Sequence, residues 1–514
     1  MIRRLRASAA AHKKIRFSFA PLLNATTPRF VIVMLEARSR RGRLLGRLHV
    51  KLVYLEGPPL PPGGVAVGWG VNASGETGAG FKSFALTHPV QGLVRGVRGV
   101  AAGFHSGFAL LNDGTVRAWG ANEAGDLGDG THVGSPTPVR VVGLSHVVQV
   151  ATAGDHALAL LENGTVYTWG GDFWGNLGNG TRDASEGVSH PIPQQVPGLQ
   201  SVVAVAAGGG DDLAVLANGT VLGWGEDKNG QLGDGSTATK LVPTPVQNLA
   251  GVRAVAIGGV PSLGGHMLAL LNDGRVMAAG RNDHGQLGLG DTQDRHTPVP
   301  VPGVENAASV SASESHSLVA LANGAVISWG ADRDGELGYP GPQLCKTAPC
   351  ALSPHPVPVA NVSIVSAGEG FSVALSGGRV LTWGDNERGQ LGDGTTSQST
   401  TPVEVSGITG ITQISASEKF TLALAQLGPE PDFSLRSAPG ALIVEWTPAP
   451  GPESWAVSWR LAARPPLAWG KPVVLPATAH NYVITGLGKA PYEVRLIRLN
   501  TPTLGPRISA AVPE

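Results

Sequence analysis

The chain has 514 residues, 42% of them apolar, and this length allows two to four domains. Its 73 glycines and 39 prolines, beside that apolar content, indicate many short strands and turns and argue against a disordered chain. The net charge is zero, but residues 1–56 hold 13 Lys and Arg against two Glu; the remainder is therefore mildly acidic, which argues against a nucleic-acid surface on it.

Residues 1–60 differ from the rest of the chain, because they are Arg-rich and carry no acidic residue before Glu36. A charged start and a short apolar run at residues 17–25 allow a secretory signal, while the Arg-rich, acid-poor composition allows an organelle transit peptide. We favour a third interpretation, a disordered segment that the Pro/Gly linker at residues 55–64 separates from the remaining residues. No stretch approaches about 18 apolar residues, so we predict no transmembrane segment.

One pattern recurs seven times between residue 65 and about residue 425. Each copy has a strand-like apolar run that ends in Trp-Gly and a polar loop punctuated by Gly, as in residues 377–394, GGRVLTWGDNERGQLGDG. Successive copies lie 50 to 55 residues apart. A period of this size indicates a repeat architecture.

Each repeat predicts four short strands. An Asn163-Gly164 turn joins the apolar runs 156–160 and 165–169, and we expect positive φ at both turn residues of such a hairpin. Two more strands are predicted at residues 138–141 and 147–151. Four strands per repeat, seven times over, predict the blades of a β-propeller.

The type of strand that begins the repeat region and the type that ends it predict how the two ends of this region meet. The first Trp-Gly strand, Val65–Trp69, lacks a preceding partner strand, and the last partner strand, Phe420–Leu424, lacks a following Trp-Gly strand. We therefore expect these two segments to pair in antiparallel fashion inside one blade. Such a closure leaves no unpaired edge strand between the chain ends.

The repeat resembles that of the regulator of chromosome condensation family. The resemblance rests on the series Ala153-Gly154-Asp155-His156, Asn163-Gly164-Thr165-Val166 and Trp169-Gly170, and on its counterparts in the other copies. It implies an all-β fold with a seven-bladed β-propeller over residues 61–428.

Three copies depart from the pattern. The fifth has Ala279 in place of Trp, and the first loop reads Gly-Glu-Thr-Gly at residues 75–78. The sixth is followed by an insertion that holds the two cysteines of the chain, Cys345 and Cys350. A local disulfide and a pair of free thiols are both compatible with this spacing.

The repeat stops near residue 428, and residues 429–514 alternate apolar and polar residues in several short runs. They resemble a fibronectin type III domain through Trp446 and through Leu487, which Tyr492 follows where a tyrosine-corner residue would lie. The resemblance implies a small β-sandwich after the propeller.

No nucleophile motif or set of metal ligands is found, so we predict no enzyme activity, catalytic residue, metal or other cofactor. His156, His266 and His316 occupy the same place in successive repeats, which favours a structural role in which each bonds a neighbouring backbone group. Residues 227–230 and 332–335 resemble the start of a calcium loop but lack its last Glu, and Asx turns explain them without metal.

We therefore expect function to lie on a surface. Within each loop two residues vary while their neighbours stay fixed, and we expect the variable pairs to face outward in a ring. The pairs are Ala73-Ser74, Glu123-Ala124, Phe173-Trp174, Lys228-Asn229, Asp283-His284, Arg333-Asp334 and Glu387-Arg388. The predicted binding residues are Phe173, Trp174, His284, Arg333 and Arg388, because aromatic and Arg side chains anchor protein interfaces. Alternatively, one of the two aromatic rings packs against the insertion at residues 183–195.

The sequence favours a monomeric, non-enzymatic scaffold that binds a protein partner through the propeller loops. The family resemblance implies a second function, guanine-nucleotide exchange on a small GTPase, which needs a protruding wedge that is not evident here. A secreted enzyme inhibitor or a cell-surface adhesion protein is a further alternative. The fibronectin-like module favours an extracellular or cell-envelope location over the cytoplasm.

Overall fold

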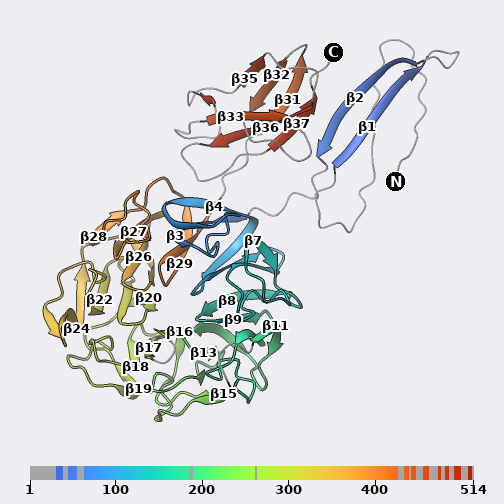
Figure 1. The fold of residues 1–514 in the computed structure, drawn as a ribbon. Helices are drawn as coiled ribbons and strands as arrows, with labels where there is room; N and C mark the ends of the chain where they lie inside the picture. Colours follow the sequence, from blue (N-terminus) through green and yellow to red (C-terminus); the bar gives the residue numbers. More distant parts are fainter. Residues whose placement is uncertain are drawn as a thin grey trace.

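The computed structural model describes residues 30–38, 44–54, 63–184, 189–260 and 263–426, together with seven strands between residues 433 and 511. Within these residues all regular secondary structure is β-strand. None of them belongs to a helix that is long and apolar enough to cross a bilayer. The sheets of residues 64–425 stand in a ring, the arrangement of a β-propeller (Figure 1).

The repeat region forms antiparallel sheets in which sequential strands are neighbours. The largest sheet contains β29 (Ile411–Ser417), β30 (Phe420–Ala425), β3 (Gly64–Asn72), β4 (Ser83–Ala102), β5 (Ser106–Leu111), β6 (Val116–Gly120) and β7 (Ser135–Arg140). The next two contain β8 (Val147–Ala153), β9 (His156–Leu161), β10 (Val166–Gly171) and β11 (Ser189–Gln195), and then β12 (Val202–Ala207), β13 (Asp211–Leu216), β14 (Val221–Gly225) and β15 (Lys240–Pro245). The fourth contains β16 (Val252–Val260), β17 (Gly264–Leu271), β18 (Val276–Gly280) and β19 (Arg295–Pro300). The last two contain β20 (Ala307–Ala312), β21 (His316–Leu321), β22 (Val326–Ala331), β23 (Gln343–Cys345) and β24 (Ala348–Val357), and then β25 (Val362–Ala367), β26 (Phe371–Ser376), β27 (Arg379–Gly384) and β28 (Ser399–Glu404).

The predicted hairpin turn is present, but its backbone conformation differs from the expectation. Between β9 and β10 only Gly164 has a positive φ, 78°. The side chain of Asn163 instead accepts a hydrogen bond from the N–H of Thr165, at 3.1 Å. The expectation of positive φ at both residues was wrong because an Asx turn lets Asn163 stabilise the loop from an ordinary backbone conformation.

The predicted pairing between the two ends of the repeat region is present. Strand β3 lies antiparallel to β30, with Val65 opposite Ala425 and Trp69 opposite Thr421. The long strand β4 pairs with β3 through residues 83–97 and with β5 through residues 97–102. The first and last repeats therefore share one continuous sheet, and β3 and β30 are both interior strands of it.

The hydrophobic core lies between neighbouring sheets. Phe108 of β5 and Trp169 of β10 belong to one buried cluster, with ring centroids 6.2 Å apart. All six Trp residues of the Trp-Gly motifs are fully buried, as a core role requires. Ala279, which replaces the seventh, is also buried and lies directly opposite the buried Met267, so a neighbouring side chain fills the space that Trp occupies elsewhere.

The first strand of a sheet has backbone N–H and C=O groups that face away from its partner strand. Side chains of the neighbouring sheet form hydrogen bonds with these groups. The amide of Gln149 in β8 donates to the carbonyl of Val205 in β12 and accepts from its N–H, at 2.8 and 3.1 Å. Gln413 of β29 makes the same two bonds to Val100 of β4. These bonds fix each sheet to the next, because buried backbone groups need partners.

Further strands lie outside the repeat region. Within residues 1–60, where the sequence predicts no strand, β1 (Phe30–Arg38) and β2 (Leu44–Tyr54) pair in antiparallel fashion, and apolar and β-branched residues are frequent in both. Toward the C-terminus, β31 (Phe433–Ala438), β32 (Ala441–Trp446) and β35 (Asn481–Thr485) form one sheet, and β34 (Val473–Leu475), β33 (Trp455–Leu461), β36 (Pro491–Arg498) and β37 (Arg507–Ala511) form another. Tyr492 lies in β36, whereas Leu487 lies outside the described residues.

Candidate functional site

All seven repeat loops share one hydrogen-bond framework. An Asn or Asp at the start of each loop accepts the backbone N–H of the residue five positions later, at 2.8 to 3.2 Å. The accepting residues are Asn72, Asn122, Asp172, Asp227, Asn282, Asp332 and Asn386. The variable pair occupies the two positions after each of them, so different side chains are displayed on one repeated backbone.

These loops lie at the same end of the sheets as the turns between the first and second strand of each sheet, because the strands are antiparallel and sequential. We call this surface the loop face. Its described residues are the loops 72–78, 122–128, 172–178, 227–233, 282–288, 332–338 and 386–392 and the turn residues 103–105, 154–155, 208–210, 259–260, 263–264, 313–315, 368–370 and 418–419.

The two members of a variable pair have different environments. In five of the seven loops the first residue is exposed and the second is half-buried. The second residue leans on the turn of the next sheet: Trp174 lies against Gly210, Asn229 against Gly264 and Asp334 against Gly370. The expectation that both residues face outward is therefore only partly right, since contacts between sheets were not evident from the sequence.

The structure places the aromatic pair at such a contact. Phe173 and Trp174 are half-buried, and their rings meet edge to face with centroids 4.8 Å apart. Trp174 also packs over the backbone of Gly210, where a Cβ would lie about 3.0 Å from the indole. The aromatics thus help to hold two sheets together, while part of each ring remains accessible.

The predicted Arg residues differ in their contacts. Arg333 is exposed. The guanidinium of Arg388 lies 4.0 Å above the ring of Phe84, which is 71% exposed. Arg388 and Phe84 therefore form a mixed cationic and aromatic surface where the first and last repeats meet.

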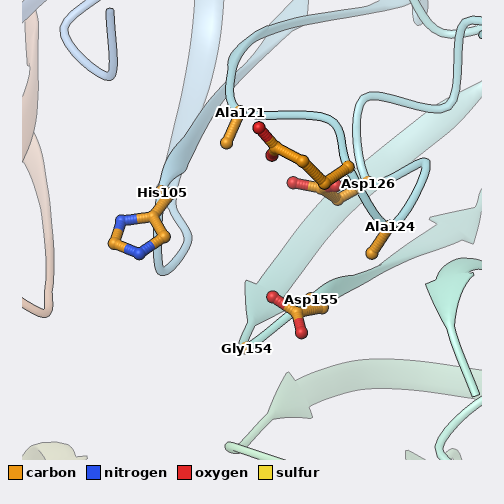
Figure 2. Close-up of a pocket in the computed structure, with 7 residues that line it drawn as sticks. His105, Ala121, Ala124, Asp126, Gly154 and Asp155 are labelled. Carbon is orange, nitrogen blue, oxygen red and sulfur yellow. The ribbon is translucent and has the colours of Figure 1, made fainter. Parts of the chain in front are cut away.

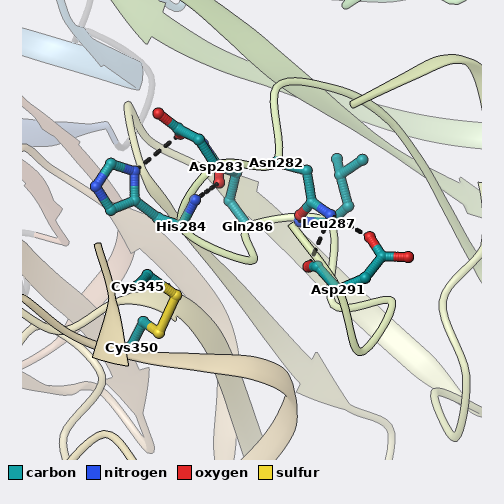
Figure 3. The surroundings of a disulfide bond; sticks show 8 residues. All are labelled: Asn282, Asp283, His284, Gln286, Leu287, Asp291, Cys345 and Cys350. Carbon is teal, nitrogen blue, oxygen red and sulfur yellow. Dashed lines mark hydrogen bonds and ion pairs between the residues drawn. A yellow bond between two sulfur atoms is a disulfide. The ribbon is translucent and has the colours of Figure 1, made fainter. Parts of the chain in front are cut away.

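His284 lies in a charged cluster beside the cysteine insertion (Figure 3). Cys345 and Cys350 form a disulfide, one of the two alternatives that the sequence left open. At the tip of the same hairpin, Lys346 lies 2.8 Å from Asp283, whose other carboxylate oxygen lies 2.9 Å from Nδ1 of His284. Burial would raise the pKa of Asp283, but hydrogen bonds from His284, Arg281 and Lys346 outweigh it and hold that pKa below its usual range.

A small cavity of about 230 Å³ opens on the loop face between the second and third repeats (Figure 2). Its lining residues are His105, Ala121, Glu123, Ala124, Asp126, Gly154 and Asp155. His105 lies 3.1 Å from Glu418 of the last repeat, and this hydrogen bond raises the pKa of the imidazole. Asp126 is 6% exposed, and its burial raises the pKa of its carboxyl to about 7.

A second acidic region surrounds Lys419. Its ammonium lies 3.3 Å from Asp385, and the charges of Asp385, Glu369 and Glu387 raise its pKa although burial opposes this. Sequence reasoning missed this cluster and the cavity. The sequence did contain a pattern that indicates an acidic surface, because Glu314, Glu369 and Glu418 occupy equivalent turn positions in three successive repeats.

The repeated histidines are structural, but their partners differ from the prediction. Nε2 of His316 lies 2.9 Å from the hydroxyl of Ser372, and Nε2 of His266 lies 2.7 Å from that of Ser317, in each case in the next sheet. His156 meets a carboxylate, that of Asp212, in the same way. The predicted backbone partner was wrong because the next sheet presents a polar side chain at this depth.

Comparison with known proteins agrees with this repeat geometry. A family model described as the RCC1-like domain matches residues 62–361, and one described as the regulator of chromosome condensation (RCC1) repeat matches residues 377–424. The chain is 32% identical over 230 residues to the ultraviolet-B receptor UVR8 of Arabidopsis thaliana, which covers 43% of this chain and 50% of the receptor. It is 31% identical over 241 residues to the probable E3 ubiquitin-protein ligase HERC6 of Homo sapiens, which covers 45% of this chain and 23% of the ligase. The chain thus spans half or less of the length of these relatives.

Solved structures show the same fold. Prp20p of Saccharomyces cerevisiae superposes with a TM-score of 0.62 at 23% identity, covering 72% of this chain and 93% of that one. Human WBSCR16 also gives a TM-score of 0.62 at 23% identity, covering 71% of this chain and 99% of that one. Because one family model matches more than half of the sequence without interruption, the chain belongs to the RCC1-like domain family.

Proposed function

We propose that this protein is a non-enzymatic scaffold that binds a protein partner through the loop face. One observation carries the proposal: seven loops with the same hydrogen-bond framework present seven different side-chain pairs on one surface. A repeated backbone with varied tips supports recognition of an extended protein surface, because the framework is rigid before binding and loses little entropy.

The ring proposed for this scaffold has seven blades within residues 61–428. Strand β4 serves as the outer strand of the blade that joins the two ends of the repeat region and as the inner strand of the next. Dividing the largest sheet at β4 leaves seven units of at least four strands each. The pairing of β3 with β30 supports closure of the ring.

The C-terminal strands support a fibronectin-like β-sandwich over residues 429–514. Sheets of three and four strands, in the orders β31-β32-β35 and β34-β33-β36-β37, are what such a sandwich needs. A monomeric protein in an extracellular or cell-envelope location is proposed with it. The disulfide supports this location, because such bonds persist mainly in oxidising compartments.

Two structures of one neighbour, yeast Prp20, support a binding role. One is described with its binding properties to Gsp1p and histones, and in the other Prp20 is bound to Kap60. At 23 and 22% identity these likenesses concern the fold, so the partner of this chain has to be found by experiment.

The test compares protein capture by the full chain and by two double variants. Arg333→Ala with Glu387→Ala removes two exposed loop-face side chains. Arg275→Ala with Arg379→Ala is the matched control, since both side chains are 59% exposed and lie at the opposite end of the sheets. A partner that the loop-face variant loses and the control keeps supports the proposal.

Equal capture by both variants contradicts a loop-face interface. A further arm uses Phe173→Ala with Trp174→Ala, which should weaken capture while the protein remains folded. Unfolding of that variant would make the aromatics structural only. Accelerated nucleotide release from a small GTPase by the purified full chain would instead favour the exchange function.

A further inference from the structure

The side chain at the fifth position of the second repeat loop, residues 122–128, differs in its hydrogen bonding from the side chains at that position in the other loops. In five loops a Glu or Gln at the fifth position folds back and accepts the backbone N–H two residues earlier. These bonds join Gln231 to Asn229, Gln286 to His284, Glu336 to Asp334 and Gln390 to Arg388, at 2.7 to 2.9 Å. Glu76 makes the same bond to Ser74, at 3.0 Å. Asn176 uses its amide to donate to the carbonyl of Gly171, at 2.7 Å.

Asp126 occupies this position in the second loop, and its side chain is one methylene shorter than that of Glu. Its carboxylate accepts no hydrogen bond from the N–H of Ala124, the residue that corresponds to the usual donor. Asp126 is nevertheless 6% exposed and lines the cavity. A carboxylate that is buried without a charged or side-chain partner is costly, so this one is available for a ligand.

The surroundings of Asp126 determine which ligand would fit. The exposed residues Glu123 and Asp155 also line this cavity, and Figure 2 shows the carboxylate of Asp155. The imidazole of His105 stands at its edge but is already hydrogen-bonded to Glu418. The cavity therefore combines three carboxylates with one engaged histidine, and no Lys or Arg lines it.

The cavity walls also suit an aliphatic stem. Ala121 and Ala124 present methyl groups on the loop side of the cavity. Lys and Arg bury their methylene stems along apolar surface and extend their charge toward acceptors. The volume of about 230 Å³ leaves room for one such side chain.

We propose that the cavity between the second and third repeats binds a Lys or Arg side chain of the protein partner, with Asp126 as the buried acceptor and Glu123 and Asp155 at the entrance. The proposal rests on the proposed function, since it names the chemistry that the loop face recognises. Charge complementarity supports it, because the loop face also carries three carboxylates, Asp385, Glu369 and Glu387, around the single ammonium of Lys419.

The experiment titrates the isotope-labelled full chain at pH 8 with N-acetyl-arginine methylamide and with the lysine analogue, and it follows backbone amide shifts by NMR. N-acetyl-norleucine methylamide is the uncharged control. We expect saturable binding near 1 mM, which is reasonable for so small a ligand. The largest shifts should fall within residues 121–126 and 154–155.

Four variants sharpen the test. Asp126→Asn removes the buried charge and should weaken binding at least about tenfold. Asp126→Glu keeps the charge but should fold back on Ala124, as Glu336 does on Asp334, and should weaken binding to a similar degree. Glu123→Gln changes an exposed residue and keeps the proposal testable if the Asp126 variants fail to fold. Glu336→Gln alters the equivalent position of another loop and should leave binding unchanged.

Shifts outside the cavity, equal binding of the norleucine probe, or full binding by Asp126→Asn would each overturn the proposal. Undiminished binding by Asp126→Glu would overturn the role given to side-chain length. If the probes fail while capture still depends on Arg333 and Glu387, the cavity proposal fails and the scaffold function stands. If the probes bind and no partner depends on the loop face, the scaffold function fails.

Discussion

Nε2 of His156 in β9 lies 2.9 Å from the carboxylate of Asp212 in β13, and both side chains are almost completely buried. Burial opposes the charged form of each group and raises the pKa of Asp212, while the Asp212 charge raises the pKa of His156. The pair joins the second and third sheets at the depth where His316 meets Ser372 between two later sheets.

We expect His156→Ala to destabilise the protein by about 3–5 kcal/mol, because Asp212 would then be buried without its partner. Asp212→Ser should cost less, since it recreates the His–Ser contact found at other sheet junctions. Urea unfolding of both variants checks this order. If Asp212→Ser lowers the unfolding free energy more than His156→Ala does, the charge of the pair contributes more to stability than its hydrogen bond.

Replacing a buried Trp should destabilise the protein, whereas introducing a Trp at position 279 should not stabilise it. Trp383 is fully buried and its indole N–H donates to the carbonyl of Glu336 at 2.8 Å, so Trp383→Ala should cost about 3–5 kcal/mol. Ala279→Trp should destabilise by about 1–3 kcal/mol, because Met267 already fills the space. Chemical denaturation measures both, and a stabilised Ala279→Trp protein would mean that a cavity remains there.

Deleting residues 61–70 should destabilise the whole repeat region in one cooperative transition. The deletion removes most of β3 and exposes β30 and β4 as edge strands. Thermal unfolding followed by calorimetry tests this expectation. A melting temperature within a degree or two of that of the full chain would show that the β3–β30 pairing contributes little.

Asp126→Gln should stabilise the protein increasingly as the pH rises. The folded pKa of Asp126, about 7, lies above its ordinary value of 3.8, so the cost of ionising it in the folded state is absent below about pH 4 and complete above about pH 7. At about 1.36 kcal/mol per pH unit this cost reaches at most about 4 kcal/mol. Unfolding free energies of both proteins between pH 4 and pH 8 should diverge in that direction, and a constant difference would contradict a buried ionising carboxyl.

Changing Cys345 and Cys350 to Ser should loosen the inserted hairpin without unfolding the ring. Closing so short a loop contributes about 2 kcal/mol in the chain-entropy description. The contact between Lys346 and Asp283 depends on the hairpin tip and should weaken with it. Hydrogen exchange of residues 343–350 should accelerate in the double variant, while exchange in β25 and β26 should stay unchanged.

The sequence alone determined the repeat, the strands within it and the pairing of its ends. These features are local, because a Gly-punctuated loop, an Asn-Gly turn and an alternating apolar run each have a preferred backbone conformation. The orphan strands Val65–Trp69 and Phe420–Leu424 extended this local information to a long-range contact. The burial of the Trp-Gly tryptophans followed for the same reason, since each repeat must present an apolar face to its neighbour.

The tertiary structure decided which residues of different repeats come together. The sequence did not show that His156 meets Asp212, that Trp174 leans on Gly210 or that the cysteines of the insertion are joined. Nor did it indicate that Asp126 is left with a buried carboxylate beside a cavity. Such contacts depend on how far each side chain reaches across a sheet junction. Glu336 stabilises its own loop, whereas Asp126, which is one methylene shorter, lines a cavity.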